Sequence, residues 1–338
     1  MLTLPAFVIF WPTSYTLQQD RKKGANKLTV SIILDVDTGV DDAFAILYAT
    51  RNPEIMVLGI TCVDGNTSLK NVCKNTLQVL DMAGASSIPV AAGANEPLMG
   101  TAGELGDASH VHGGDGLAGL SNSETSRTLD NRHAIELIRD LIENSKDPVT
   151  LVPIGPLTNI ALFISTFPET AKKLERIVLM GGSASGGNVT AAAEFNVWHD
   201  PEAAHIVFNS GLPLTMYGLD VFYDLKVDET HLKTLRETGS TAANFAADLI
   251  EFRLGSLGSE MCLGDYGAVA TLLHPDLTES TVMNVVVDSS QGPGRGQTIC
   301  DARLEAPELY DFRAGKECTV ILKVDSDAMV KLWMEQMK

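Results

Sequence analysis

The sequence predicts an α/β fold, a Rossmann-like open sheet that is mostly parallel and carries helices on both faces. From residue 28 onward, short runs rich in β-branched residues alternate with segments of helical periodicity. This alternation is typical of parallel sheets whose strands are joined by helices. No internal repeat or low-complexity linker divides the chain, so residues 28–338 are expected to form a single domain. Residues 1–27 are expected to be a poorly ordered N-terminal extension.

Each element is predicted from its own pattern. Seven apolar, β-branched runs indicate strands at 28–34, 55–62, 88–91, 149–153, 176–180, 214–217 and 282–287. Amphipathic segments between and after them indicate helices at 42–49, 68–83, 132–144, 156–166, 201–209, 242–257 and 266–273. Ligands of such sheets bind beyond the carboxyl ends of the strands, so functional residues are expected in the loops there. Three loops are long enough to suggest function: 93–120, 181–199 and 291–303.

The composition bears on the binding partners and the cellular location of the protein. The net charge of −18, from 43 acidic and 25 basic residues among 338, argues against a nucleic acid or an anionic membrane as partner. The apolar stretch 2–11 is too short to span a bilayer and follows no Lys or Arg, so it does not fit a secretion signal well. Five scattered cysteines without C-x-x-C spacing predict neither a disulfide framework nor a zinc site, and they favour a cytoplasmic location.

The strongest local signal is the segment D-V-D-T-G-V-D-D at 35–42, where a strand ends and a helix begins. Alternation places Asp35 and Asp37 on one side of the strand end, and Asp41 and Asp42 fall in the first helical turn. Helix N-terminal amides satisfy one or two carboxylates, but not four. The crowded negative charge therefore predicts a hard divalent cation bound through oxygen, Ca²⁺ or Mg²⁺.

The segment also allows other interpretations. A capped strand-to-helix turn with surplus surface charge needs no cation. An EF-hand fails, because Val40 and Ile46 stand where Gly and Glu are required. A metal-dependent phosphatase of the haloacid dehalogenase type also begins with D-x-D, but Gly264-Asp265 is followed by no second acid.

Several motifs together resemble the nucleoside hydrolase family. The aspartate segment resembles the family's D-x-D-P-G-x-D-D, and V-D-G-N at 63–66 resembles its V-x-G-N. Further segments agree in order and spacing: H-G-G-D-G-L at 112–117, G-P-L-T-N-I-A at 155–161, M-G-G at 180–182, G-N-V-T at 187–190, E-F-N at 194–196 and D-P-E-A-A at 200–204. The resemblance covers about residues 30 to 325, and it implies a calcium-dependent enzyme that hydrolyses the N-glycosidic bond of ribonucleosides.

The resemblance also implies roles for individual residues. Asp37, Asp42, Asp265 and the carbonyl of Ile154 are expected to hold Ca²⁺, with Asp37 as the general base that activates water. His112 is expected beside the base as a catalytic residue. Substrate-binding residues are expected to be Asp41, Asn66, Met180, Asn188, Glu194, Phe195 and Asn196. Family members are commonly homodimers or homotetramers, so an oligomer is expected.

Two positions depart from the family pattern. Thr38 replaces a proline, which is expected to loosen the turn without removing a ligand. Gly264 stands where many members have a histidine that protonates the departing base. Members without that histidine can stack the base between aromatic rings, here expected from Trp198, Phe222, Tyr223 or Phe252, and this predicts a preference for purines over uridine. A calcium-dependent protein that only binds nucleosides is the non-enzymatic alternative.

Overall fold

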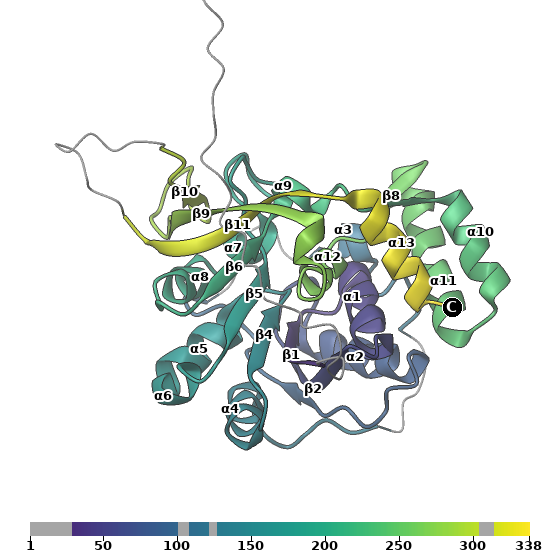
Figure 1. Cartoon of the computed structure of the whole chain (residues 1–338), viewed down its shortest axis with the longest axis horizontal. Helices are drawn as coiled ribbons and strands as arrows, with labels where there is room; N and C mark the ends of the chain where they lie inside the picture. The colour runs from purple at the N-terminus through teal and green to yellow at the C-terminus, as the bar shows by residue number, and fades with distance from the viewer. Residues whose placement is uncertain (1–28, 101–107, 122–126, 304–313) are drawn as a thin grey trace, which may run out of the picture.

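The structure, a computed structural model, describes residues 29–100, 108–121, 127–303 and 314–338. The expected N-terminal extension at 1–27 lies outside these residues. Strands from Val30 to Val324 enter one nine-stranded sheet (Figure 1). Its order is β10-β9-β11-β6-β5-β4-β1-β2-β3. The pairs from β11 through β6 to β3 are parallel, whereas β9 runs antiparallel to β11 and to β10. The predicted α/β class is confirmed.

The strands lie close to the predicted segments. Those of the main sheet are β1 (Val30–Val36), β2 (Ile55–Cys62), β3 (Val90–Ala92), β4 (Val149–Pro153), β5 (Arg176–Met180), β6 (Leu214–Tyr217), β9 (Thr278–Val287), β10 (Thr298–Cys300) and β11 (Lys316–Val324). A separate two-stranded sheet pairs β7 (Lys226–Asp228) with β8 (Glu260–Cys262). The sequence pattern did not predict β7, β8, β10 or β11. Three of these have only three residues each, too few to show a period, and charged residues begin β11.

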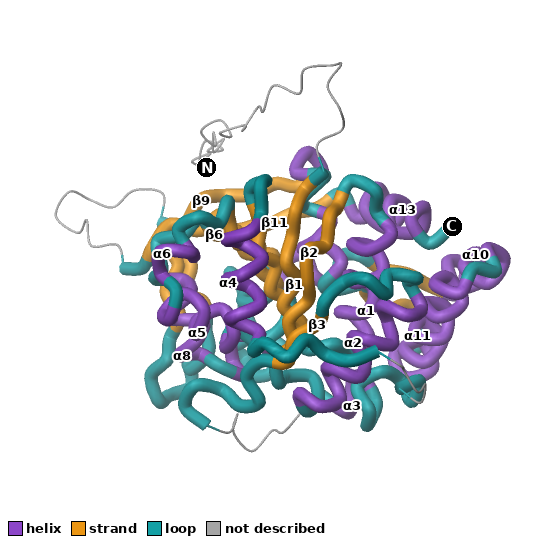
Figure 2. The backbone as a smooth tube through the Cα atoms, turned by 90° about the horizontal axis from the view of Figure 1, so that it is seen from below, coloured by secondary structure: helices purple, strands orange, loops and turns teal. Residues whose placement is uncertain are grey.

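Helices cover both faces of the sheet (Figures 1 and 2). The seven predicted helices are α1 (Val40–Arg51), α2 (Leu69–Met82), α4 (Ala134–Asn144), α5 (Thr158–Thr166), α8 (Pro201–Phe208), α11 (Thr241–Leu257) and α12 (Tyr266–Ala270). Those not predicted are α3 (Ser109–His112), α6 (Pro168–Ala171), α7 (Phe195–His199), α9 (Leu219–Phe222), α10 (Glu229–Thr238) and α13 (Ser326–Gln336).

The core divides at the sheet, because successive residues of a strand point to opposite faces. Ile32 and Leu34 of β1 pack in a cluster with α1, α2, α11 and α13, while Ile33 packs in a second cluster with α4, α5 and α8. The carboxyl ends of β1, β2 and β4 stand level, since Asp35 is in register with Thr61 and with Pro153. The loops that follow these strands therefore meet at one edge.

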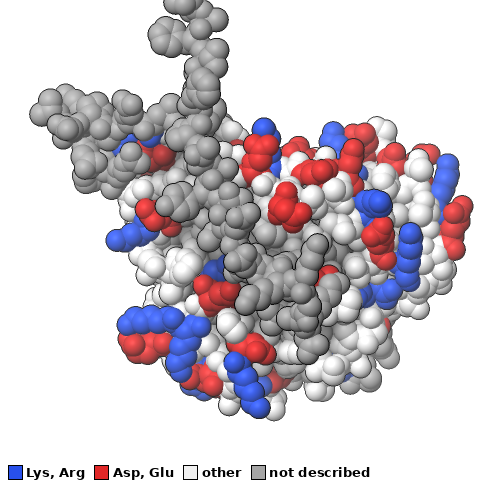
Figure 3. Space-filling view, in the orientation of Figure 1, with Lys and Arg blue, Asp and Glu red and all other residues white. Residues whose placement is uncertain are grey.

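The surface and the helices bear on possible partners. On the face shown in Figure 3, Lys and Arg side chains lie among Asp and Glu side chains. The described residues include ion pairs such as Arg295 with Glu202, at 2.8 Å. Within the described ranges, none of the helices has the length and apolar character needed to cross a membrane.

Candidate active site

Asp35 joins neighbouring elements beneath the site. Its Oδ1 accepts hydrogen bonds from the Thr61 hydroxyl at 2.6 Å and from Asn159 Nδ2 at 2.8 Å. Asn159 Nδ2 also donates to the carbonyl of Cys62, at 3.0 Å. Burial raises the pKa of Asp35 to about 7. Asp35 and Asn159 thus connect β1, β2 and α5 and hold the strand ends in position.

The turn after β1 is closed by Asp42. The Asp42 carboxylate accepts from the backbone N–H of Gly39 at 3.0 Å and of Asp37 at 3.2 Å, as expected for an acid in the first turn of a helix. The Thr38 hydroxyl lies 2.6 Å from the Thr76 hydroxyl, which ties the turn to α2 without the proline of the family pattern. A side chain at residue 39 has no room, because its Cβ would lie 2.6 Å from His112 Nδ1.

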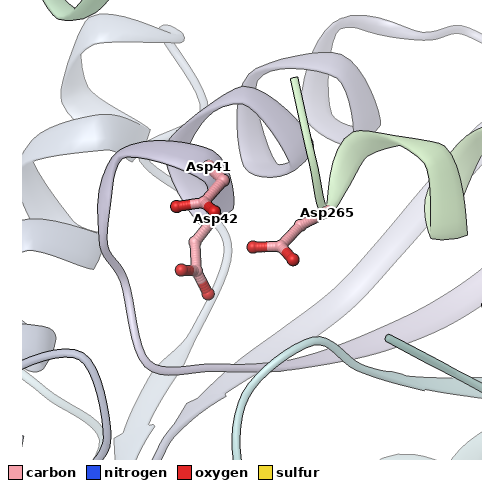
Figure 4. A group of neighbouring side chains, drawn as sticks. All are labelled: Asp41, Asp42 and Asp265. Carbon is pink, nitrogen blue, oxygen red and sulfur yellow. The ribbon is translucent and has the colours of Figure 1, made fainter. Parts of the chain in front are cut away.

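Three acidic side chains converge next to this turn. One carboxylate oxygen from each of Asp41, Asp42 and Asp265 lies within 4.8 Å of the others (Figure 4). Asp265 comes from the start of α12, more than 200 residues later in the chain. Asp37 adjoins this group, and its Oδ2 accepts from the Asn66 N–H at 2.7 Å. Among the described atoms, Oδ1 of Asp37 and Oδ1 of Asp41 are buried and accept no hydrogen bond.

Burial and mutual repulsion make this acidic group unfavourable when ionised. Burial, followed by the charge of Asp42, raises the pKa of Asp37 well above its usual range, and burial with Asp41 raises that of Asp265. Burial and Asp41 raise the pKa of Asp42 to about 7. Carboxylates that are buried, close together and short of hydrogen bonds are the donor set that a hard divalent cation neutralises. The residues therefore fit a metal.

The loop after β5 supplies a second polar group. Glu194 caps α7, with Oε1 accepting from Asn196 N at 2.9 Å and Oε2 accepting from Gly182 N at 2.9 Å. Asn196 Nδ2 donates to the carbonyls of Ile154 at 2.9 Å and Met180 at 3.1 Å. These contacts anchor the loop to the residues that follow β4 and end β5. Asn188 Oδ1 accepts from the N–H of Phe195 at 2.9 Å, which folds the loop back on itself.

His112 lines the site next to the first turn of α1. Its Nδ1 accepts from the N–H of Val40 at 3.1 Å and is 3.3 Å from Asp41 Oδ1. Because Nδ1 acts as an acceptor, the proton of the neutral imidazole is on Nε2. No hydrogen bond from Nδ1 to Asp41 forms in that tautomer, so the close pair is a contact rather than a salt bridge.

These residues surround one cavity of about 690 Å³. Ten of the predicted site residues line it: Asp41, Asn66, His112, Ile154, Met180, Asn188, Glu194, Phe195, Asn196 and Asp265. Asp37 and Asp42 do not line the cavity, because both are fully buried in the turn next to it. The volume is sufficient for a small-molecule ligand.

The cavity is also lined by residues that the sequence pattern did not indicate. Lys226, Arg253 and Glu260 line it and lie on β7, α11 and β8, outside the loops at the strand ends. Of the four aromatic residues proposed for stacking, Trp198, Phe222 and Tyr223 line the cavity. Phe252 does not, and it is 38% exposed. Adjacent helix positions point about 100° apart, so its neighbour Arg253 takes the inward direction. No local sequence signal marks Arg253.

The backbone conformation and the neighbouring side chains at Gly264 leave no room for a larger residue. Its φ of +52° is in the left-handed region, and a Cβ there would lie 2.5 Å from Cζ of Phe222 and 3.0 Å from Cβ of Asp41. The Phe222 ring thus occupies the space into which a side chain at 264 would extend. The histidine of the family pattern cannot be accommodated here without displacing that ring.

Comparisons with known proteins agree with this geometry. The family model for inosine-uridine preferring nucleoside hydrolases matches residues 32–331. The pyrimidine-specific ribonucleoside hydrolase RihA of Shewanella baltica is 40% identical over 282 residues, which cover 81% of this chain and 87% of that protein. RihA of Escherichia coli K12 is 37% identical over 321 residues, covering 92% and 99%.

Solved structures give the same result. A purine-preferring ribonucleoside hydrolase from Gardnerella vaginalis superposes with a TM-score of 0.81 and 32% identity, over 91% of this chain and 98% of that chain. An inosine-guanosine nucleoside hydrolase superposes with a TM-score of 0.79 and 27% identity, over the same shares. The match of family model, relatives and fold leads to one conclusion: the chain belongs to the nucleoside hydrolase family and is a ribonucleoside hydrolase.

Proposed function

We propose that this enzyme hydrolyses the N-glycosidic bond of ribonucleosides to free base and ribose in a calcium-dependent reaction, with Asp37 as the general base. The observation that carries the proposal is the acidic group of partly buried Asp41 and buried Asp37, Asp42 and Asp265, in which two carboxylate oxygens accept no hydrogen bond from described atoms. Closing the turn after β1 needs only Asp42, and four crowded carboxylates destabilise the ionised fold unless a cation neutralises them.

Asp37, Asp42, Asp265 and the Ile154 carbonyl are the proposed calcium ligands. All four are oxygen donors, which suits Ca²⁺ better than a softer metal. Asn196 already donates to the Ile154 carbonyl, but a carbonyl oxygen has a second lone pair. When bound, Ca²⁺ would supply a fixed water of lowered pKa.

Each residue of the site has a proposed role in bond cleavage. Asp37, whose Oδ1 accepts no hydrogen bond among the described atoms, would be held ionised by the cation and would accept the proton of the attacking water. Asp41, Asn66, Asn188, Glu194 and Asn196 are proposed to hold the ribose hydroxyls, with Met180 and Phe195 packing beside the sugar. The negative charge of the acidic group favours the oxocarbenium-like state at C1′. His112, with its proton on Nε2, is the proposed donor toward the base.

Pyrimidine ribonucleosides are the proposed preferred substrates. The support is the 37–40% identity to two pyrimidine-specific enzymes over most of the chain. The purine preference expected from the sequence stays the alternative, supported by the rings of Trp198, Phe222 and Tyr223 in the cavity wall.

A substrate panel tests the proposal. Uridine, cytidine and inosine are incubated with the enzyme, and released reducing sugar is measured. After extended dialysis against a chelator, ribose release is expected to stop, and added Ca²⁺ is expected to restore it. Full activity in protein shown to be free of metal would contradict the calcium requirement. Phosphate release from a sugar phosphate would favour the phosphatase alternative, and tight binding of intact nucleoside would favour the binding protein.

We also propose a cellular location and an oligomeric state. The five cysteines are all free thiols, which supports a reducing, cytoplasmic location. A homodimer or homotetramer is proposed from the family resemblance. Light scattering of the purified protein measures the oligomeric state.

A further inference from the structure

The charges around the cavity are distributed unevenly. The acidic side chains Asp41, Glu194 and Asp265 lie at the end formed by the strand termini. A second group of lining residues, here called the outer wall, is formed by Val111, His112, Phe222, Arg253, Met261 and Cys262 from α3, α9, α11 and the β8 region. The outer wall adjoins the acidic side chains, since His112 Nδ1 lies 3.3 Å from Asp41 Oδ1. A ligand whose sugar contacts the acidic side chains therefore has the outer wall beside it.

Arg253 is the cation of the outer wall. Its Nη1 donates to the Val111 carbonyl at 2.6 Å, which fixes the guanidinium next to the residue that precedes His112. Arg253 also lies close to Cys262: burial raises the pKa of that thiol to about 12, the charge of Asp41 adds to the rise, and the charge of Arg253 opposes it. The guanidinium thus lines the cavity next to α3, together with the Phe222 ring that fills the space at Gly264.

Arg253 has no acidic partner in the described part of the chain. The second cation that lines the cavity, Lys226, is paired with Glu260 at 3.1 Å. No comparable ion pair involves Arg253 among residues 29–100, 108–121, 127–303 and 314–338. A guanidinium has five N–H donors, and only one of those of Arg253 bonds the Val111 carbonyl. The other donors can bond a ligand in the cavity.

The charged side chains that line the cavity match the charges that develop when the bond breaks. When the bond from C1′ to the base nitrogen breaks, its electron pair stays with the base, so positive charge grows on the sugar and negative charge on the base. Carboxylates at the sugar end and a guanidinium at the base end both stabilise this separation more than they stabilise the neutral substrate.

We propose that Arg253 contacts the departing base and stabilises its negative charge by hydrogen bonding. This inference rests on the proposed function. The attacking water forms the new bond to C1′ and gives its proton to Asp37, while the base leaves with the electron pair of the broken bond. Arg253 transfers no proton, since a guanidinium stays charged; the base anion takes its proton from His112 or from solvent. Because arginine only donates, it selects bases with an acceptor near the leaving nitrogen, such as a pyrimidine carbonyl oxygen.

The test compares a poor and a good leaving group. Arg253→Met removes the charge and keeps much of the apolar length, and Arg253→Gln keeps a donor for the Val111 carbonyl. Each variant is assayed with uridine, with inosine and with p-nitrophenyl riboside, whose leaving anion is stable by itself. We expect both variants to lose about 10²–10³-fold in kcat on the better nucleoside, the cost typical of losing one charge-stabilising donor. The p-nitrophenyl reaction is expected to change little.

Lys226→Met is the matched control, because it removes the other cation of the cavity wall without touching Val111. The ratio of kcat on the nucleoside to kcat on p-nitrophenyl riboside is expected to be the same in this variant as in the unmodified enzyme. Equal losses on nucleoside and p-nitrophenyl riboside would overturn the inference, because they would show that Arg253 only positions α3. Unchanged nucleoside turnover in Arg253→Gln would also overturn it. If the unmodified enzyme cleaves p-nitrophenyl riboside but no nucleoside, the proposed function itself is wrong, and the inference falls with it.

Discussion

At the scale of the residue, the site depends on side chains that few hydrogen bonds satisfy. Asp37 is fully buried, one of its oxygens accepts from Asn66 and the other accepts nothing among the described atoms. Asp42, by contrast, spends its carboxylate on the N–H groups of the turn and on Asn66 Nδ2. The two residues therefore differ in their hydrogen bonds: both oxygens of Asp42 accept bonds, whereas Asp37 has one oxygen that accepts none among the described atoms.

Asp37→Asn tests this difference. The amide keeps the size of the side chain and a carbonyl oxygen, but it does not accept a proton. We expect kcat to fall by about 10²–10⁴-fold, the usual contribution of a general base, with a much smaller change in KM. Steady-state kinetics on the best nucleoside, with calcium content measured in parallel, check this. A variant with full metal content that retained more than about a tenth of the kcat would place the base elsewhere.

At the scale of the element, the sequence predicted the parts of the fold that have a strong period. All seven predicted strands and all seven predicted helices are present, because each pairs an apolar face with the core. The missed strands β7, β8 and β10 have three residues each and gain their order from neighbours rather than from a pattern. Arg253 was missed for a similar reason. Its place in the cavity depends on contacts between distant segments, such as its hydrogen bond to the Val111 carbonyl of α3.

The C-terminal helix α13 illustrates stability that no local pattern shows. Its Trp333 is fully buried, donates from Nε1 to the Phe44 carbonyl at 3.2 Å and packs edge-on against the Phe44 ring at 5.4 Å. Phe44 belongs to α1, the helix that presents Asp41 and Asp42. The last helix of the chain thus supports the first helix behind the acidic group.

Trp333→Ala is expected to destabilise the protein by about 3–5 kcal/mol, the cost typical of removing a large buried aromatic side chain. Denaturant unfolding measures the change. Trp198→Ala serves as a control for loss of a tryptophan, since Trp198 lines the cavity rather than the core. Unfolding free energies that were equal in Trp333→Ala and the unmodified protein would show that α13 contributes nothing to the stability of α1.

At the scale of the whole molecule, the acidic group lowers the stability of the fold as long as no cation neutralises it. Asp37, Asp42 and Asp265 are buried within a chain that already carries a net charge of −18. Folding brings these carboxyl groups out of water and toward one another, which costs free energy whenever they are ionised. A cation that binds only the folded state reverses this cost, because binding free energy adds to the free energy of unfolding.

The pH dependence of stability follows from the same groups. Burial and like charges raise the pKa of Asp42 to about 7 from its ordinary value of 3.8, and they also raise the pKa values of Asp37 and Asp265 well above that ordinary value. An acid with a higher pKa in the folded state binds more protons when folded, so raising the pH destabilises the fold between the two pKa values. Metal-free protein is therefore expected to be more stable at pH 5 than at pH 8, by on the order of a few kcal/mol. Saturating Ca²⁺ is expected to remove most of this difference, because it holds the carboxylates ionised in the folded state.

Urea unfolding of metal-free and calcium-loaded protein at both pH values measures the effect. Asp42→Asn lacks one of the titrating groups, so its metal-free form is expected to lose less stability between pH 5 and pH 8. Equal stability of the metal-free protein at pH 5 and pH 8 would mean that burial does not destabilise these carboxylates, and the reason for a cation at this site would disappear.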